Sequence, residues 1–179
     1  MSQAPSSGGP GPLEPARVAE LLHASQMLVV GELTGLGEDG GWHPAPGEWC
    51  AREVVGHLIE AERRGFAGRI RAMLDEDRPT FEPWDQSVEA RERRDCDKES
   101  RALVDEFVTL RRESVAMVKK LVIAALRRSG VHRTVGELFV PDLLQEWVHH
   151  DRNHTKQLLS IAMDRVWPHM ANAQKFKDD

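Results

Sequence analysis

Residues 143–161 read LLQEWVHHDRNHTKQLLSI and carry an apolar stripe with the spacing of an α-helix. The stripe consists of residues that follow one another by three or four positions: Leu143, Trp147, His150, His154, Leu158 and Ile161. Residues spaced in this way share one face of a helix, so two imidazoles take positions that face the core. Uncharged histidines at i and i+4 can bind one metal ion, as they do in the H-E-x-x-H helix of metalloproteases. The stretch therefore predicts a core-facing helix with two candidate metal ligands.

The length and composition indicate one globular domain. A chain of 179 residues can bury roughly two-thirds of its unfolded surface without a covalent staple. Cys50 and Cys96 are the only cysteines and form no C-x-x-C motif, so they suggest neither a disulfide framework nor a thiolate zinc site. This cysteine content fits a reducing, cytoplasmic setting. No signal peptide is recognised, and no apolar run approaches the roughly 18 residues of a membrane helix, so we expect a soluble protein without a membrane partner.

Charge and residue types restrict the function further. The net charge is −5, and arginines are spread among acidic residues, so no broad basic face is available for a nucleic acid. Tyrosine is absent, which leaves His, Glu, Asp and bound water to transfer protons. We therefore expect a small-molecule substrate and no nucleic-acid partner.

The chain reads as four amphipathic helices between two tails. Residues 1–13 are rich in Gly, Pro and Ser and are expected to form a disordered N-terminal tail. Helices are expected over residues 15–33, 51–77 and 100–129, and from residue 141 onward. The predicted domain spans residues 14–168, and residues 169–179 form a polar tail. No alternating strand pattern is found, so the predicted fold class is all-α, a four-helix bundle.

The connection over residues 78–99 bears on the order of the helices. It has about 20 residues without clear periodicity, which is unusual in a compact domain and often functional. Fully extended it spans roughly 65 Å, more than the roughly 40 Å of a 27-residue helix. The second and third helices can therefore run in the same direction, in an up-down-down-up bundle. Gly130 is expected to end the third helix, and a short connection then leads to Pro141.

Two histidines from one helix leave a metal under-coordinated, so a third ligand is expected from a neighbouring helix. His57 is the candidate, because it lies at the margin of the stripe formed by Val54, Leu58, Ala61 and Ile70. His149 points about a hundred degrees away from His150 and is expected to be exposed. The alternative reading of His57 is an edge histidine that makes an ordinary hydrogen bond.

Two segments together resemble a known family. Residues 43–64 read HPAPGEWCAREVVGHLIEAERR, in which Trp49 precedes His57 by eight positions and Glu62 follows it by five. The second segment, residues 143–159, contains the pattern H-D-x-x-H-x-x-Q. With these motifs the chain resembles the DinB/YfiT-like family of metalloenzymes over nearly its whole length. Cys50 departs from the Ser or Thr that usually follows the family's tryptophan, which affects only the strength of a helix cap.

The resemblance implies a fold, a metal site and an oligomeric state. It implies a four-helix bundle in up-down-down-up order and a metal site formed by His57, His150 and His154. A divalent metal is expected, with zinc first and nickel, iron or manganese compatible with the same ligands. Asp151, together with Asn153 and Gln157, matches supporting positions, although each has the alternative of a solvated polar residue. A homodimer is plausible in this family.

Three neutral imidazoles leave coordination positions open, which is typical of catalytic sites. Family members include thiol transferases that use low-molecular-weight thiols such as bacillithiol or mycothiol, and a mycothiol-dependent maleylpyruvate isomerase. By this analogy we expect a metal-dependent thiol (S-) transferase. Glu60 or Glu62 is a candidate base, Asp151 a candidate partner of a ligand, and Arg63 or Arg64 a candidate anchor for an anionic thiol. Solvated surface is the alternative for each of these residues.

Two other classes of function stay open. A metal-dependent hydrolase needs only a bound water and a nearby carboxylate, and it turns over without an added thiol. A non-catalytic protein would use the metal as a clip between helices, and a fourth protein ligand would then close the shell. Cys50, Cys96 or a carboxylate are the candidates for that fourth ligand.

Overall fold

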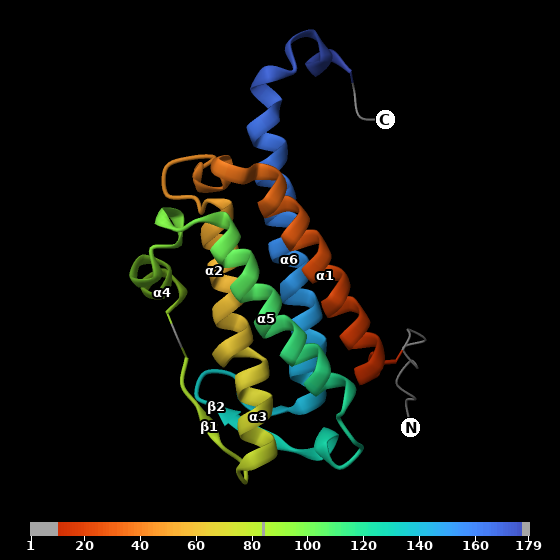
Figure 1. Cartoon of the computed structure of the whole chain (residues 1–179). Helices are drawn as coiled ribbons and strands as arrows, with labels where there is room; N and C mark the ends of the chain where they lie inside the picture. The colour runs from red at the N-terminus through yellow and green to blue at the C-terminus, as the bar shows by residue number, and fades with distance from the viewer. Residues whose placement is uncertain (1–10, 84, 177–179) are drawn as a thin grey trace, which may run out of the picture.

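The four long helices form the bundle that the sequence predicts. The computed structural model describes residues 11–83 and 85–176 of the chain. The helices are α1 (Pro15–Leu36), α2 (Ala51–Glu60) with its continuation α3 (Ala67–Asp75), α5 (Ser100–Lys119) and α6 (Val140–Val166). Figure 1 shows α1 and α6 rising while α2–α3 and α5 descend. The all-α, up-down-down-up prediction is therefore confirmed.

Local sequence explains where several helices begin. Pro15 occupies the first position of α1, where its missing N–H costs no hydrogen bond. At the start of α2, Glu53 Oε2 accepts the backbone N–H of Cys50 at 2.9 Å. Asp142 Oδ2 does the same for Phe139 at the start of α6, at 2.8 Å. These acidic side chains satisfy backbone donors that a helix N-terminus leaves unpaired.

The second helix is not continuous, contrary to the sequence-based expectation for residues 51–77. A π turn over Ala61–Gly65 separates α2 from α3, and Phe66 N–H bonds Ala61 O at 2.8 Å. Ala61 and Ile70 are nine residues apart. In a regular α-helix this is roughly 2.5 turns, so the two side chains would lie on opposite sides of the helix. The extra residue in the π turn restores the phase, and Ile70 is fully buried. Gly68 is required here, since a Cβ would lie 2.2 Å from Arg63 O.

The third helix ends at Lys119, ten residues before the predicted end at Ser129. Residues 120–128 contain no Gly or Pro, so the sequence carries no stop signal there. Tertiary contacts turn the chain instead: Arg128 Nε donates to Met73 O at 2.6 Å, and its guanidinium also bonds Glu76 O. Ala124, expected in the core seam, is consequently exposed.

A small sheet at one end of the bundle was not predicted. Its strands are β1 (Thr80–Phe81), β2 (Ser129–His132) and β3 (Gly136–Phe139). β1 pairs in parallel with β2, with Thr80 opposite Val131, and β2 pairs antiparallel with β3. Strands of two to four residues are too short to show an alternating pattern, which explains why sequence periodicity missed them. The long connection also contains α4 (Gln86–Arg93) and a 3₁₀ turn at Asp95–Asp97.

The core is divided into two apolar clusters by a polar layer at mid-height. One cluster surrounds Trp147 and Phe66, and the other surrounds Leu58 and Phe107. Along α1, α5 and α6, buried polar residues lie between the two clusters: Ser25, Arg111, Ser114, Asp151 and Thr155. From the second helix, Glu62 joins this layer by its hydrogen bond with Arg111, and buried His57 lies against His150. Buried polar groups are costly unless they are paired, so this layer is where a functional site is expected.

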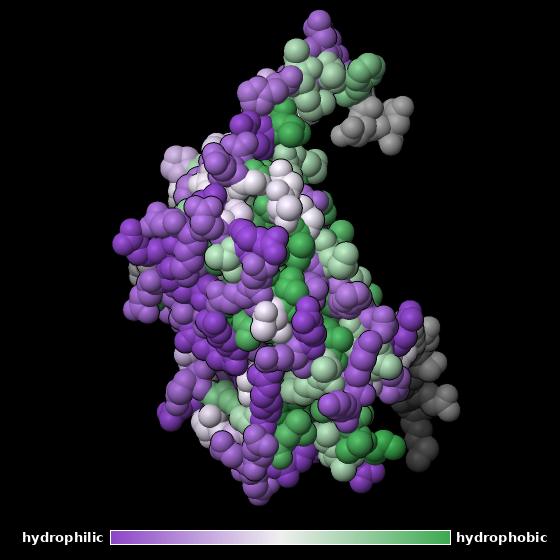
Figure 2. All heavy atoms as spheres, viewed as in Figure 1, coloured by the Kyte–Doolittle hydropathy of each residue, from purple (hydrophilic) through white to green (hydrophobic). Residues whose placement is uncertain are grey.

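The ends of the domain and its surface add three observations. Of the predicted disordered tail, residues 1–10 lie outside the described residues, whereas Leu13 exchanges two hydrogen bonds with Gln145 at 3.0 Å. The end of α6 projects beyond the other helices (Figure 1) and exposes Met163 and Trp167. Figure 2 shows hydrophilic side chains gathered over α4 and its surroundings. Among the described residues, no helix is long and apolar enough to cross a membrane.

Candidate metal centre

The three histidines predicted as ligands come together from two helices. His57 belongs to α2, and His150 and His154 lie one turn apart on α6. The Nε2 atoms of His57 and His150 are 2.9 Å apart, and the ring of His154 has its centroid 4.5 Å from each of the other two. One ligand atom from each ring lies within 4.8 Å of the others. His149 is exposed, as expected.

The histidines of this centre are held in the uncharged form. Burial, assisted by the two neighbouring imidazoles, lowers the pKa of His57 to about 3. Burial also lowers the pKa of His150 to about 3, with further contributions from His154, Arg111 and His149. The pKa of His154 is lowered as well, chiefly by burial. All three rings are therefore neutral at pH 7, which is the form that binds a metal.

A hydrogen bond also fixes the tautomer of His154. Its Nδ1 lies 3.0 Å from Gln157 Oε1. An amide oxygen only accepts, so Nδ1 carries the proton and the lone pair belongs to Nε2. Gln157, which the sequence marked only as a supporting position, thereby orients one ligand.

The donor set fits a divalent ion. Ligand nitrogens roughly 2.0–2.1 Å from a tetrahedral ion lie roughly 3.3 Å from one another, and the separations here run from 2.9 Å up to at most 4.8 Å. His150 Nδ1 is buried and has no hydrogen-bond partner among the described residues. Neutral imidazoles suit zinc, nickel and iron alike, so the donor atoms do not select one metal.

Aromatic side chains enclose the centre. The Trp49 ring lies 5.4 Å from that of His57 and stacks on His154 at 6.4 Å. Phe66 meets His150 edge-on at 5.1 Å and stacks on Trp147 at 5.4 Å. These rings exclude water from one side of the histidines, which strengthens electrostatic interactions there.

A buried arginine lies beside the histidines, and sequence reasoning missed it. Arg111 on α5 is fully buried. It donates to Glu62 Oε1 at 2.5 Å, to Asp151 at 2.6 and 3.1 Å, and to Leu22 O at 2.8 Å. A signal was present in the sequence: Phe107, Arg111, Ser114 and Val118 follow a spacing of four, three and four. A charged residue on an apolar stripe indicates a buried ion pair.

This ion-pair network determines what Glu62 and Asp151 can do. Burial raises the pKa of Glu62, and the charge of Arg111 opposes that shift. Burial alone would lower the pKa of Arg111, but Asp151 and Glu62 outweigh it and raise the pKa. Both carboxylates are therefore engaged by a cation that stays charged. Neither is presented as an open base, and no hydrogen bond from Asp151 to a ligand histidine is found in the described part of the chain.

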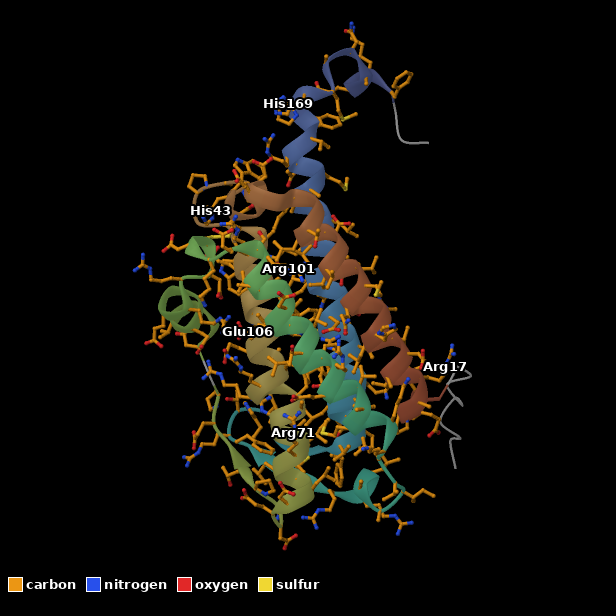
Figure 3. All side chains as sticks on the ribbon, viewed as in Figure 1. Arg17, His43, Arg71, Arg101, Glu106 and His169 are labelled. Atoms are coloured by element: carbon orange, nitrogen blue, oxygen red, sulfur yellow. A yellow bond between two sulfur atoms is a disulfide. The ribbon has the colours of Figure 1, made fainter. Side chains whose placement is uncertain are left out.

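The other predicted site residues lie in a network of ion pairs outside the centre. Glu60 Oε1 accepts from Arg93 Nη1 at 2.7 Å and from Arg63 Nη1 at 3.2 Å. Arg63 also pairs at 2.6 Å with Glu106 of α5, which is labelled in Figure 3. Arg64 pairs with Glu60 at 3.1 Å and with Glu89. A role for these residues as base or thiol anchor stays a prediction.

An open pocket of about 510 Å³ leads to the centre through His154. Its lining comes from the loop before α2 and the second half of α6: Pro44, Gly47, Glu48, Trp49, His154, Gln157, Ser160, Ile161 and Asp164. The charged members are the carboxylates Glu48 and Asp164, and the lining includes neither Arg63 nor Arg64. The spacing of His154, Gln157, Ile161 and Asp164 by three and four residues could have indicated this face from the sequence.

The cysteines contradict the expectation that they stay unpaired. Cys50 and Cys96 form a disulfide, although 46 residues separate them in the sequence. Sequence spacing could not reveal this pair, because it depends on the packing of the 3₁₀ turn Asp95–Asp97 against α2. Neither cysteine joins the three histidines, and among the described residues no fourth His, Cys, Asp or Glu belongs to that group of ligand atoms.

The fold is similar to two solved structures. One is YfiT from Bacillus subtilis, described as a probable metal-dependent hydrolase with an unusual four-helix bundle topology; the TM-score is 0.76 at 15% identity, covering 90% of this chain and 93% of that chain. The other is a mutant of the mycothiol-dependent maleylpyruvate isomerase; the TM-score is 0.66 at 11% identity, covering 82% of this chain and 61% of that chain. At such identities the likeness establishes the fold.

Sequence comparison identifies the family. No curated protein matches the sequence. The family model described as the DinB superfamily matches residues 14–158, a segment that contains all three histidines and most of the bundle. The resemblance carried by the two histidine motifs is thus confirmed, and the chain belongs to the DinB superfamily.

Proposed function

We propose that this protein is a metal-dependent enzyme whose ligands are His57, His150 and His154. The observation that carries the proposal is the convergence of three neutral imidazoles beside an open pocket. These residues would hold a divalent ion, with zinc as the first candidate, which would supply Lewis acidity and lower the pKa of a thiol or a water molecule at the site. Three protein ligands leave room for such a molecule, as in catalytic zinc sites.

Transfer of a low-molecular-weight thiol to an electrophile is the reaction that the site supports best. Glu60, Glu62 and Asp151 are each paired with arginine, so none of them is presented as a free base. A thiol that is acidified by the metal needs no protein base, whereas activation of water usually employs one. In the proposed reaction the thiol loses its proton to solvent, its sulfur bonds to an electrophilic carbon, and the leaving group departs with the bonding electrons. The likeness to a mycothiol-dependent isomerase supports this choice.

The protein's own residues would position the reactants. Gln157 keeps the lone pair of His154 Nε2 available. The ring of Trp49 covers His57 and His154 and leaves access from the side of the pocket. Glu48 and Asp164 give that pocket a negative charge, which favours neutral or cationic groups over anions. The substrate is therefore expected to be a small molecule without an acidic group on this side.

Hydrolysis is the second candidate, and a specific observation favours it. Glu48 and Asp164 line the pocket that reaches His154, and the described hydrogen bonds tie neither side chain to an arginine. Either carboxylate could accept a proton from a water molecule. The likeness to YfiT, described as a probable metal-dependent hydrolase, supports this candidate. A non-catalytic metal clip has less support, because no fourth protein ligand joins the described group.

The test compares metal content and turnover in three proteins. We would load wild type, His154→Ala and His149→Ala with zinc, remove free metal, and measure bound metal by mass spectrometry. His149 is the matched control, since it is exposed on the same helix. With the Cys50–Cys96 disulfide intact, one equivalent is expected in wild type and in His149→Ala, and at least tenfold weaker binding in His154→Ala. No retained metal in wild type would overturn the proposal.

Turnover then separates the two reactions. A panel of small thiols with a chromogenic haloarene tests S-transfer, and p-nitrophenyl esters without any thiol test hydrolysis. S-transfer is supported if consumption of the haloarene depends on both thiol and metal. Ester cleavage that needs metal but no thiol, and that falls in Asp164→Asn or Glu48→Gln, would favour hydrolysis. A cytoplasmic location, a homodimer and the lack of a nucleic-acid partner stay predictions.

A further inference from the structure

A second cluster of metal-binding side chains lies at the N-terminus of α2, away from the three histidines. It consists of Cys50, Cys96, His43 and Glu53, and one ligand atom from each lies within 4.8 Å of the others. His43 belongs to the loop that precedes α2 (Figure 3), and Cys96 belongs to the 3₁₀ turn before α5. Cys50 lies seven residues before His57, or roughly 10 Å along the helix axis. The two clusters are therefore separate.

His43 is oriented as a metal ligand. Its Nδ1 lies 2.7 Å from the backbone carbonyl oxygen of Glu48. A carbonyl oxygen only accepts, so Nδ1 carries the proton and Nε2 carries the lone pair. That Nε2 lies 3.5 Å from Cys96 Sγ. A disulfide sulfur has no proton to donate, so the lone pair of His43 faces a sulfur atom with which it makes no hydrogen bond.

We propose that reduction of the Cys50–Cys96 disulfide converts this cluster into a second metal site. Cys50, Cys96 and His43 supply two thiolates and one imidazole, and Glu53 completes a tetrahedral set. Two sulfur donors favour zinc or another thiophilic divalent ion over magnesium or calcium. The proposal does not depend on the proposed enzymatic function, because it uses none of the residues of the three-histidine centre.

The chemistry balances with a small thiol as the reductant. Two equivalents of thiol reduce the disulfide by exchange and leave as their own disulfide, and the protein then carries two Cys thiols. Binding of a divalent ion releases the two thiol protons to solvent. Cys50 stands at the N-terminus of a ten-residue helix, a position that stabilises a thiolate. The backbone N–H of Cys50 also bonds Glu53 Oε2 at 2.9 Å, which holds that carboxylate beside the sulfur.

Contacts other than the disulfide keep the cysteines together. Arg52 on α2 donates to Cys96 O at 3.0 Å and to Ser100 Oγ at 3.1 Å. The turn also approaches α2 where Gly56 has no side chain, since a Cβ there would lie 1.7 Å from Asp95 Oδ2. The side chain of Asp95 is held in turn by Arg93 and Lys98, each with a contact of 2.7 Å. The ligands are therefore expected to stay close after reduction, which lowers the entropic cost of binding a metal.

The second site adjoins the pocket of the metal centre. The loop that carries His43 continues into Pro44, Gly47, Glu48 and Trp49, all of which line that pocket. Either a disulfide or a metal ion would fix the end of this loop. The protein could thus keep its pocket in shape under oxidising and reducing conditions alike.

The near-ultraviolet charge-transfer absorption of cobalt(II) reports sulfur ligands. Full-length protein would be reduced, desalted without oxygen and titrated with cobalt, with oxidised protein as the reference. Thiolate-to-cobalt charge-transfer absorption in the near ultraviolet is expected only after reduction. It should saturate by two equivalents of added cobalt, because the three-histidine centre also takes up the ion, and added zinc should abolish it. The three-histidine centre has no sulfur and does not contribute to this band. Absence of the band from reduced protein would overturn the proposal.

Variants identify the ligands. Cys96→Ser should remove the bisthiolate absorption, and His43→Ala should weaken cobalt binding at least tenfold. His23→Ala, an exposed histidine elsewhere, is the matched control and should leave the titration unchanged. If His43→Ala binds as tightly as wild type, His43 is not a ligand and the site as proposed is wrong. If circular dichroism shows that a variant is unfolded, the rate of cysteine alkylation in reduced wild type replaces it as the test. Zinc should slow the modification of both cysteines, and equal rates with and without zinc would contradict the proposal.

Discussion

Replacement of Arg111 tests the reasoning about the buried polar layer. Arg111→Met keeps most of the side-chain volume and removes the guanidinium, which leaves Glu62 and Asp151 buried without their shared counter-ion. Loss of one partner from a buried ion pair costs about 3–5 kcal/mol, because an uncompensated charge remains. The free energy of unfolding of a domain is only about 5–15 kcal/mol. The variant is therefore expected to lose a large part of its stability at neutral pH.

The size of this loss should depend on pH. Burial already raises the pKa of Glu62, and removal of Arg111 takes away the charge that opposes the shift. In the variant the folded state then binds more protons than the unfolded state between pH 4.5 and the raised pKa. Stability must fall as the pH rises through that window. Arg111→Met should therefore be closer to wild type at pH 5 than at pH 8.

Urea unfolding at both pH values, on metal-free protein, measures this prediction. The matched control is Arg101→Met on the same helix, where the exposed arginine pairs with exposed Asp105 and the change should stay within about 0.5 kcal/mol. A second variant also replaces both carboxylates, Arg111→Met/Glu62→Met/Asp151→Leu, and should recover at least half of the loss. The reasoning is refuted if Arg111→Met costs no more than Arg101→Met, or if its loss is larger at pH 5.

Three further predictions follow from the site and the fold. In metal-free protein, folding lowers the pKa of His57 from 6.5 to about 3. Between pH 6.5 and pH 3 the unfolded state therefore binds more protons than the folded state, so the free energy of unfolding falls as the pH drops. This histidine alone should cost about 2 kcal/mol between pH 8 and pH 5; urea unfolding of wild type and His57→Gln measures it, and equal pH dependence in both would contradict it. Gln157→Ala should weaken zinc binding about 10–100-fold by freeing the His154 ring, as measured by competition with a chromogenic chelator; unchanged affinity would remove Gln157 from the site. Gly68→Ala should destabilise the protein by at least about 1–3 kcal/mol, because the added Cβ meets Arg63 O. The control, Gly31→Ala, adds a Cβ in open space on α1 and should stabilise the protein by up to about 1 kcal/mol. Similar melting temperatures for the two variants would refute the π-turn argument.

Local periodicity predicted the four long helices and the histidines of the centre, but not the break in the second helix or the end of the third. The stripe over residues 143–161 placed His150 and His154 toward the core, and both are half-buried beside buried His57. His57 was the candidate third ligand from its place at the margin of a helix stripe, and the family motif added Trp49; the structure places both rings against His154. These features depend on spacing within single helices, which the sequence records directly. Binding of a metal by these residues stays a prediction.

Features that depend on contacts between distant segments could not be predicted in this way. The early end of α5 follows from bonds of Arg128 to the end of α3, and the disulfide follows from packing of residue 96 against α2. The partners of Arg111 come from three other helices. No local pattern specifies such partners, although a charge within an apolar stripe signals that they exist.

The π turn at Ala61–Gly65 has a consequence for how members of this family should be aligned. The turn amounts to an insertion of one residue inside a helix. Deletion of one residue from it would restore a regular helix and leave every later position on the same face, because the turn absorbs the extra residue. Ile70 and Met73 would then stay in the core. Relatives without the turn should therefore show a one-residue gap between His57 and Phe66, with the apolar pattern unchanged on the far side of that gap.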